Sequence, residues 1–241
     1  MKRIFNLTNI RLILMFGLVI FLFSFTSKRN EQRKIAKIDV VFVGENNLFI
    51  KSETVNKLLI ENMSNRLAIE KDNLDLNKLE RILDSNAMID ESDVFVSIDG
   101  VLKAVVKQKT PVARVVDEFD SFYIDYKGSK MPLSDNFTAR VPLVSGNVNG
   151  KNEEKLAQLL RVIYEDDFLK KNIIAIQIMP NASLKMFNRN YDYQIDFGSL
   201  RNFETKFKNY KAFFQKAVLD STLNKYKKID LRFTKQVVCT K

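Results

Sequence analysis

Residues 100–115 read GVLKAVVKQKTPVARV, and the organisation of the chain can be worked out from this stretch. Apolar residues recur at every second position around its start, at Val94, Val96 and Ile98 and then at Leu102, Ala104 and Val106. This spacing is typical of strands with one buried face. Asp99 and Gly100 between the two runs form a strong two-residue hairpin signal. The sequence therefore predicts a β-hairpin, with Pro111 closing the unit.

Three further elements are predicted before this hairpin. The β-branched run at 38–43, IDVVFV, indicates a strand that Gly44 ends. A helix capped by Ser52 follows, and a second helix is capped by Asp75. Their apolar faces comprise Val55, Leu58, Leu59 and Met63, and then Leu76, Leu79, Ile82 and Leu83. Residues 38–115 thus read as a βααββ domain.

The rest of the chain, 116–241, is predicted to form a mixed α/β domain. Its short strands are expected at 122–125, 131–133 and 140–144, and then as an antiparallel meander at 173–178, 184–187 and 193–197. A helix from Glu153 to about Phe168 separates the two groups. The fold class of the whole chain is accordingly α+β.

A long helix and an extended segment are expected after the meander. The helix carries an apolar stripe that consists of Leu200, Phe203, Phe207, Tyr210 and Phe214. Its opposite face holds Arg201, Lys206, Lys208, Lys211 and Lys216, which we interpret as a solvated face. Residues 229–233 and 236–238 form the last extended segment. In the first of these, Ile229, Leu231 and Phe233 alternate with charged residues and are expected to pack inward.

An apolar, uncharged run lies close to the N-terminus. Residues 12–25 read LILMFGLVIFLFSF, and we expect a transmembrane helix at 11–27, between a tail at 1–10 and a polar tether at 28–37. A cleaved signal peptide is the alternative, but large phenylalanines occupy the end of the run, where a cleavage site needs small residues. Basic residues flank both ends, so charge does not choose the orientation, although a short first tail favours a cytoplasmic N-terminus.

Composition excludes several kinds of site. The chain has no histidine and one cysteine, Cys239, so the commonest general base and the usual zinc ligand sets are absent. We predict no catalytic residues, no metal site and no cofactor.

The formal charge of +10 is concentrated from Ser199 onward, with eleven basic and three acidic residues. Nucleic acid is not an expected partner, because no aromatic and basic residues interleave on exposed strands.

Five short motifs, in this order and spacing, resemble the FtsQ/DivIB cell-division family, in a form similar to its Bacteroidetes-like branch. They follow the predicted anchor and comprise residues 100–115 above, FYIDYKGSKMPL at 122–133, RVPLVSG at 140–146, IDLRF at 229–233 and TKQVV at 234–238. The resemblance implies that 38–115 is a POTRA domain and 116–241 a β domain. It also implies a bitopic inner-membrane protein with a cytoplasmic N-terminus and a periplasmic body.

The resemblance further implies a non-enzymatic divisome scaffold that helps to control septal peptidoglycan synthesis. Its partners would be FtsB-like and FtsL-like proteins and other divisome components, with FtsB adding a strand beside the last strand of the β domain. The matching positions here are Phe233, Thr234, Lys235, Gln236 and Val237. The commoner family pattern has a small residue and glycine where this chain has Lys235 and Gln236. A POTRA-type assembly or secretion factor and a membrane-anchored cell-wall enzyme are the alternative interpretations.

Overall fold

The structure is a computed structural model that describes residues 7–31, 35, 37–44, 49–63, 74–117, 120–147 and 153–241. The chain divides into two compact units, residues 1–108 and 109–241. Each unit has a hydrophobic core of its own. The division falls seven residues before the expected domain end at Val115, because the strand that contains Val115 pairs within the second unit.

The first element is the helix α1, Leu7–Glu31, which contains the predicted transmembrane run. Within it, residues Asn9–Arg29 are long and apolar enough to cross a membrane. Their large apolar side chains are exposed, as expected for a surface that lipid would cover. The helix continues through Lys28 to Glu31, so the predicted tether at 28–37 is wrong in its first part. Ile35 is also buried, in the core of the first unit.

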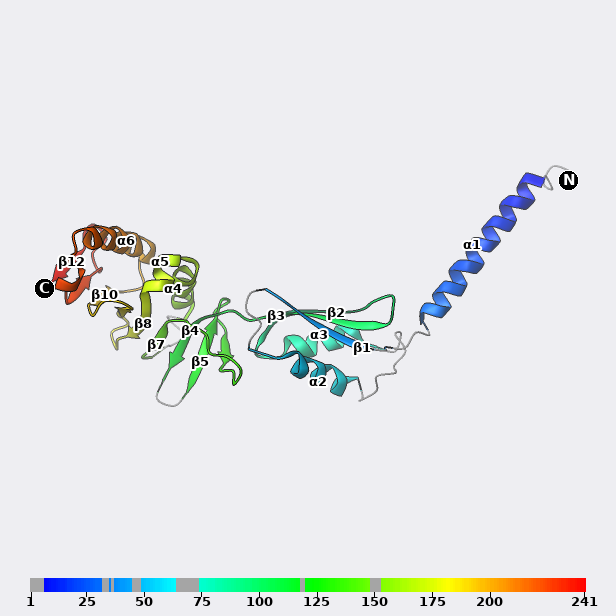
Figure 1. The fold of residues 1–241 in the computed structure, drawn as a ribbon, viewed down its shortest axis with the longest axis horizontal. Coiled ribbons are helices and arrows are strands. Elements are labelled where there is room, and N and C mark those ends of the chain that lie inside the picture. The colour runs from blue at the N-terminus through cyan, green and yellow to red at the C-terminus, as the bar shows by residue number, and fades with distance from the viewer. Residues whose placement is uncertain are drawn as a thin grey trace. The chain divides into compact units, whose positions relative to one another are not determined.

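The first unit combines a small sheet with two helices, and its predicted element order is confirmed. The chain forms β1 (Lys37–Val43), α2 (Ser52–Asn62), α3 (Leu76–Asp84), β2 (Ile89–Val96) and β3 (Val101–Gln108). The sheet order is β1-β3-β2, with β1 parallel and β2 antiparallel to β3. Leu102, Ala104 and Val106 of β3 are fully buried beneath the helices, which Figure 1 shows beside this sheet.

Two local predictions in this unit need correction. Lys51 occupies the N-cap position of α2 without a side-chain cap hydrogen bond, and Ser52 is the first helical residue. Asp75 caps α3 as predicted, because its side chain accepts a hydrogen bond from the Lys78 N–H. The hairpin loop has four residues, 97–100, rather than two. The Ser97 side chain bonds the backbone of Val101 and the Asp99 carboxylate, and this closes the longer loop. Ile98 therefore lies outside the strand and is exposed.

The second unit is built on a mixed sheet of nine strands among the described residues. Its order is β12-β11-β10-β9-β8-β7-β4-β5-β6. The strands are β4 (Pro111–Val116), β5 (Ser121–Asp125), β6 (Lys130–Pro132), β7 (Leu143–Ser145), β8 (Ile173–Ile178), β9 (Leu184–Asn188), β10 (Gln194–Gly198), β11 (Lys228–Asp230) and β12 (Val238–Thr240). The pairs β4–β7, β7–β8 and β10–β11 are parallel. The predicted meander β8–β9–β10 is antiparallel and is confirmed.

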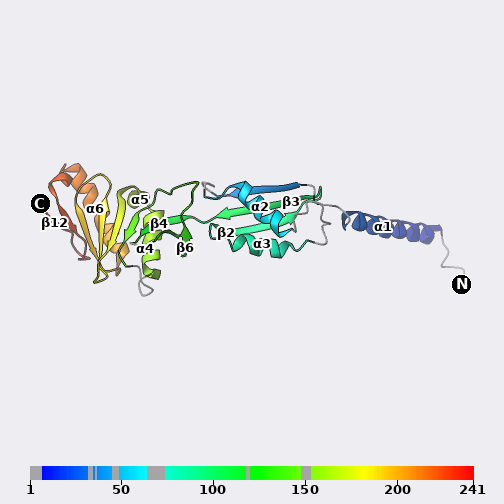
Figure 2. The ribbon, with the colours of Figure 1, turned by 90° about the horizontal axis from the view of Figure 1, so that it is seen from below.

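Helices cover this sheet, as Figures 1 and 2 show. Their buried apolar side chains form one core with those of the sheet. They are α4 (Glu153–Glu165), α5 (Asp167–Asn172) and α6 (Phe203–Leu219), and a short 3₁₀ turn η2 (Leu223–Lys225) follows. The helix predicted from Glu153 to Phe168 is therefore two helices. Asp166 separates them because its carboxylate accepts hydrogen bonds from the Phe168 and Leu169 N–H groups and starts α5. The fold class α+β is confirmed.

Candidate functional site

The C-terminal strand β12 forms one edge of the large sheet. It pairs with β11 in antiparallel register, Ile229 opposite Cys239, and no described strand lies on its outer side. The strand contains no proline, and its first and last residues, Val238 and Thr240, are exposed. At the other end of the sheet, β6 ends in Pro132, which lacks a backbone donor. Of the two edges, β12 is therefore the better template for another strand.

Hydrogen bonds in β12 indicate which backbone groups face outward. The Thr240 carbonyl accepts a hydrogen bond from the Lys227 N–H at 2.9 Å, so it faces the β11 side. Successive residues of a strand direct their N–H and C=O groups to opposite sides. We therefore expect the N–H and C=O of Cys239 to face the open edge, where an added strand would need them.

An ion pair fixes the point at which the chain leaves β11. Both oxygens of Asp230 accept from the Arg232 guanidinium, at 2.5 to 3.0 Å, and Oδ1 also accepts from the Arg232 backbone N–H at 3.0 Å. These side-chain hydrogen bonds hold the pKa of the Asp230 carboxyl below its usual value. Leu231 between them is buried and donates to the Asp196 carbonyl. Residues 230–232, which we call the clamp, thus hold the chain in place at the end of the strand.

The predicted docking residues lie in the connection between β11 and β12 rather than in a strand. They are Phe233, Thr234, Lys235, Gln236 and Val237, and all but Val237 are exposed. The Phe233 ring lies 6.0 Å from the Arg232 guanidinium and is 49% exposed, so its predicted inward packing is wrong. The Thr234 carbonyl accepts from the Asn209 side chain of α6 at 2.8 Å, which ties the connection to the helix. The last strand itself begins at Val238.

The solvated basic face predicted for α6 is wrong at Lys206. This residue is only 3% exposed, and its Nζ donates to the Phe197 and Ser199 carbonyls at 2.9 and 2.7 Å. Lys211 is partly covered and pairs with Asp166. Sequence periodicity missed Lys206 because the lysine stem bends toward carbonyls that only the tertiary fold brings near. The apolar stripe is buried at Phe207 and Tyr210, as predicted.

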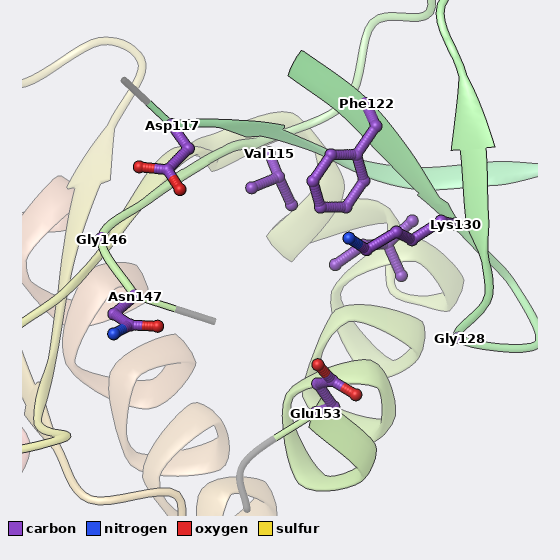
Figure 3. Close-up of a pocket in the computed structure, with 9 residues that line it drawn as sticks. Val115, Asp117, Phe122, Gly128, Lys130, Gly146, Asn147 and Glu153 are labelled. Carbon is purple, nitrogen blue, oxygen red and sulfur yellow. The ribbon is translucent and has the colours of Figure 1, made fainter. Parts of the chain in front are cut away.

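A cavity of about 160 Å³ lies elsewhere in the second unit, between the β4–β5 strands and α4. Figure 3 shows Asp117 and Glu153 at its rim, with Val115 and Phe122 on its wall and Lys130 beside the Phe122 ring. The Lys130 ammonium lies 4.4 Å from the ring centroid, which is a cation–π contact. The cavity is small for a sugar chain between two carboxylates. Among the described residues, no group of His, Cys, Asp and Glu could hold a metal ion.

Comparisons with known proteins identify one family and one similar solved structure. Residues 110–240 match the family described as FtsQ/DivIB, C-terminal related. A solved structure, the major extracytoplasmic domain of the trans isomer of the bacterial cell division protein DivIB from Geobacillus stearothermophilus, is similar at 17% identity and a TM-score of 0.33. That similarity covers 47% of this chain and 95% of the solved one. No curated protein matches the sequence.

Proposed function

Since the chain belongs to the FtsQ/DivIB, C-terminal related family and so has a role in cell division, we propose that it is a membrane-anchored division scaffold. Its α1 would cross the inner membrane once, and its two units would lie in the periplasm. Its action would consist of binding an FtsB-like and FtsL-like pair, without chemistry of its own. In this way it would help to control septal peptidoglycan synthesis.

The open edge at β12 is the observation that supports this proposal best. A partner strand binds such an edge through backbone groups, so it needs an extended, proline-free rim rather than a special side-chain chemistry. The neighbouring connection 233–237 offers exposed polar side chains and the Phe233 ring as additional contacts. We therefore place the docking surface on β12 together with residues 233–237.

A proline at Cys239 tests this placement. In the variant Cys239→Pro the backbone donor that we expect to face outward is lost, whereas prolines at such an edge position leave pairing with β11 intact. The affinity of the full chain in detergent for the candidate FtsB-like and FtsL-like proteins, measured by co-purification at several partner concentrations, should fall at least tenfold. A tenfold loss of affinity equals about 1.4 kcal/mol, the scale of one lost backbone hydrogen bond.

The variant Cys239→Ala is the matched control, because it changes the same side chain but keeps the N–H group. It should capture the partners as the unchanged chain does. Equal capture by Cys239→Pro and by a chain truncated before Thr234 would refute strand addition at this edge. Circular dichroism of each variant would show that the sheet has formed.

A further inference from the structure

A second pocket, of about 320 Å³, lies where β9, β10 and α6 meet, and its lining is rich in positive charge. Lys185, Lys206 and Arg232 contribute to it, with Asp196 as the one acidic residue among its described lining. The family match and the proposed strand capture assign no role to this pocket. The kind of ligand that the pocket could bind depends on which of the charged groups around it are already paired.

Lys206 is the buried charge in this pocket. Its two hydrogen bonds to the Phe197 and Ser199 carbonyls use two of the three donors of an ammonium group. No described hydrogen bond uses the third donor, and the side chain is among those that line the pocket, although Nζ also lies 4.8 Å from the centre of the Phe197 ring. Burial lowers the pKa of Lys206, while the nearby charge of Asp230 acts in the opposite direction. The two carbonyl dipoles, the Phe197 ring and the more distant Asp230 charge stabilise this cation, but none of them is a directly paired anion, so its burial is only partly compensated.

The carboxylates near the pocket are already bound by other residues. Asp196 pairs with Lys228 at 2.5 Å and accepts from Gln194 at 2.6 Å. Asp230 is held through both oxygens by Arg232. In the described part of the chain, neither Lys185 nor Lys206 forms an ion pair with a carboxylate. The pocket therefore holds two cations without an anionic partner.

Gly198 contributes to the shape of this pocket. Its φ of +74° is unfavourable for any residue with a side chain, and a Cβ there would lie 2.7 Å from the Arg232 Cγ. The missing side chain lets the Arg232 stem cross close to β10 while its guanidinium reaches Asp230.

We propose that this pocket binds a small oxyanion, a carboxylate or a phosphate group. The anion accepts the remaining donor of Lys206 and is attracted by Lys185, so it completes the compensation of the buried charge. Free phosphate and the carboxylate end of a short peptide are two sources of this chemistry. Binding here requires neither β12 nor a partner protein.

Titration of the full chain in detergent micelles tests the proposal. The probes are inorganic phosphate and N-acetyl-alanyl-alanine, each added at constant ionic strength, with the amide of the same peptide as a neutral control. The amide N–H signals of Gly198 and Ser199 in the NMR spectrum should shift and saturate with at least one anionic probe. The neutral peptide amide should leave these two signals unchanged.

Two lysine variants complete the test. Lys185→Met removes the charge of a partly exposed residue and should weaken the binding at least tenfold, whereas Lys235→Met, outside the pocket, should leave it unchanged. Saturation by phosphate alone identifies a free anion as the ligand, and saturation by the peptide alone identifies a peptide end. The proposal is wrong if neither probe saturates, or if Lys185→Met binds as tightly as the unchanged chain.

Discussion

Single residues set the geometry of the C-terminal edge, and Asp230 has the largest part in this. Its carboxylate is almost buried and binds both the guanidinium and the backbone N–H of Arg232. It holds the chain where it leaves β11, together with the hydrogen bonds of the Leu231 N–H and the Thr234 carbonyl. The same pair keeps the positive charge of Arg232 close to the oxyanion pocket.

Replacement of Asp230 by Asn removes the ion pair with Arg232 and should lower the free energy of unfolding. The loss should be only about 1 kcal/mol, because the Arg232 side chain is half exposed and solvent weakens the pair. The pKa of Asp230 is lowered in the folded state, so its contribution is complete above its unfolded value of about 4. The contribution is lost as the pH falls through the lower folded value. Urea unfolding at pH 6 and pH 3 measures both effects.

Asp220→Asn provides the comparison, because Asp220 is exposed at the end of α6. It should change stability little at either pH. The stability gap between Asp230→Asn and the unchanged chain should shrink toward pH 3. A gap that stays constant or widens there would contradict the role assigned to this carboxylate.

The residue scale also shows where sequence reasoning ends. Alternation predicted the buried Ile229 and Leu231, because a two-residue period reports directly on the faces of a strand. The same alternation placed Phe233 inside, although the clamp between Asp230 and Arg232 ends the strand after Asp230. Lys206 could not be identified in this way, because its carbonyl partners lie at Phe197 in β10 and at Ser199 directly after that strand.

At the scale of elements, periodicity predicted the order of strands and helices better than their number and their ends. Apolar spacing continues from α4 into α5, so one helix was expected where two exist. The break at Asp166 depends on a local cap and on an ion pair with Lys211 of α6, and the second of these is a tertiary contact. The terminal extended segment is likewise two short strands joined by a connection.

The break between α4 and α5 leads to a prediction for Asp166. The variant Asp166→Ala loses the cap of α5 and the partner of Lys211, and should cost about 1–2 kcal/mol of stability. Asp167→Ala is the matched control, since this neighbouring aspartate is exposed in the first turn and should change stability by less than about 0.5 kcal/mol. Thermal unfolding of both variants measures the difference. Equal losses would show that Asp166 is no more important than any surface charge.

At the scale of the whole molecule, the proposed function requires that α1 crosses a membrane and that the two units lie on its periplasmic side. The helix is long enough to span, since 25 residues correspond to about 37 Å. Basic residues flank its uncharged run at 12–27, with Lys2, Arg3 and Arg11 before the run and Lys28 and Arg29 after it. The positive-inside rule is therefore balanced, and orientation needs a direct measurement.

The single native cysteine makes that measurement simple. In a Cys239→Ala background, Thr234→Cys places a thiol on an exposed position of the β11–β12 connection, and Lys2→Cys places one before α1. A membrane-impermeant maleimide, added to cells with a permeabilised outer membrane, should label position 234 and leave position 2 unlabelled until the inner membrane is lysed. Labelling of position 2 alone in unlysed cells would place the docking edge in the cytoplasm. A periplasmic strand partner could not reach the edge there, and the proposed mode of action would be wrong.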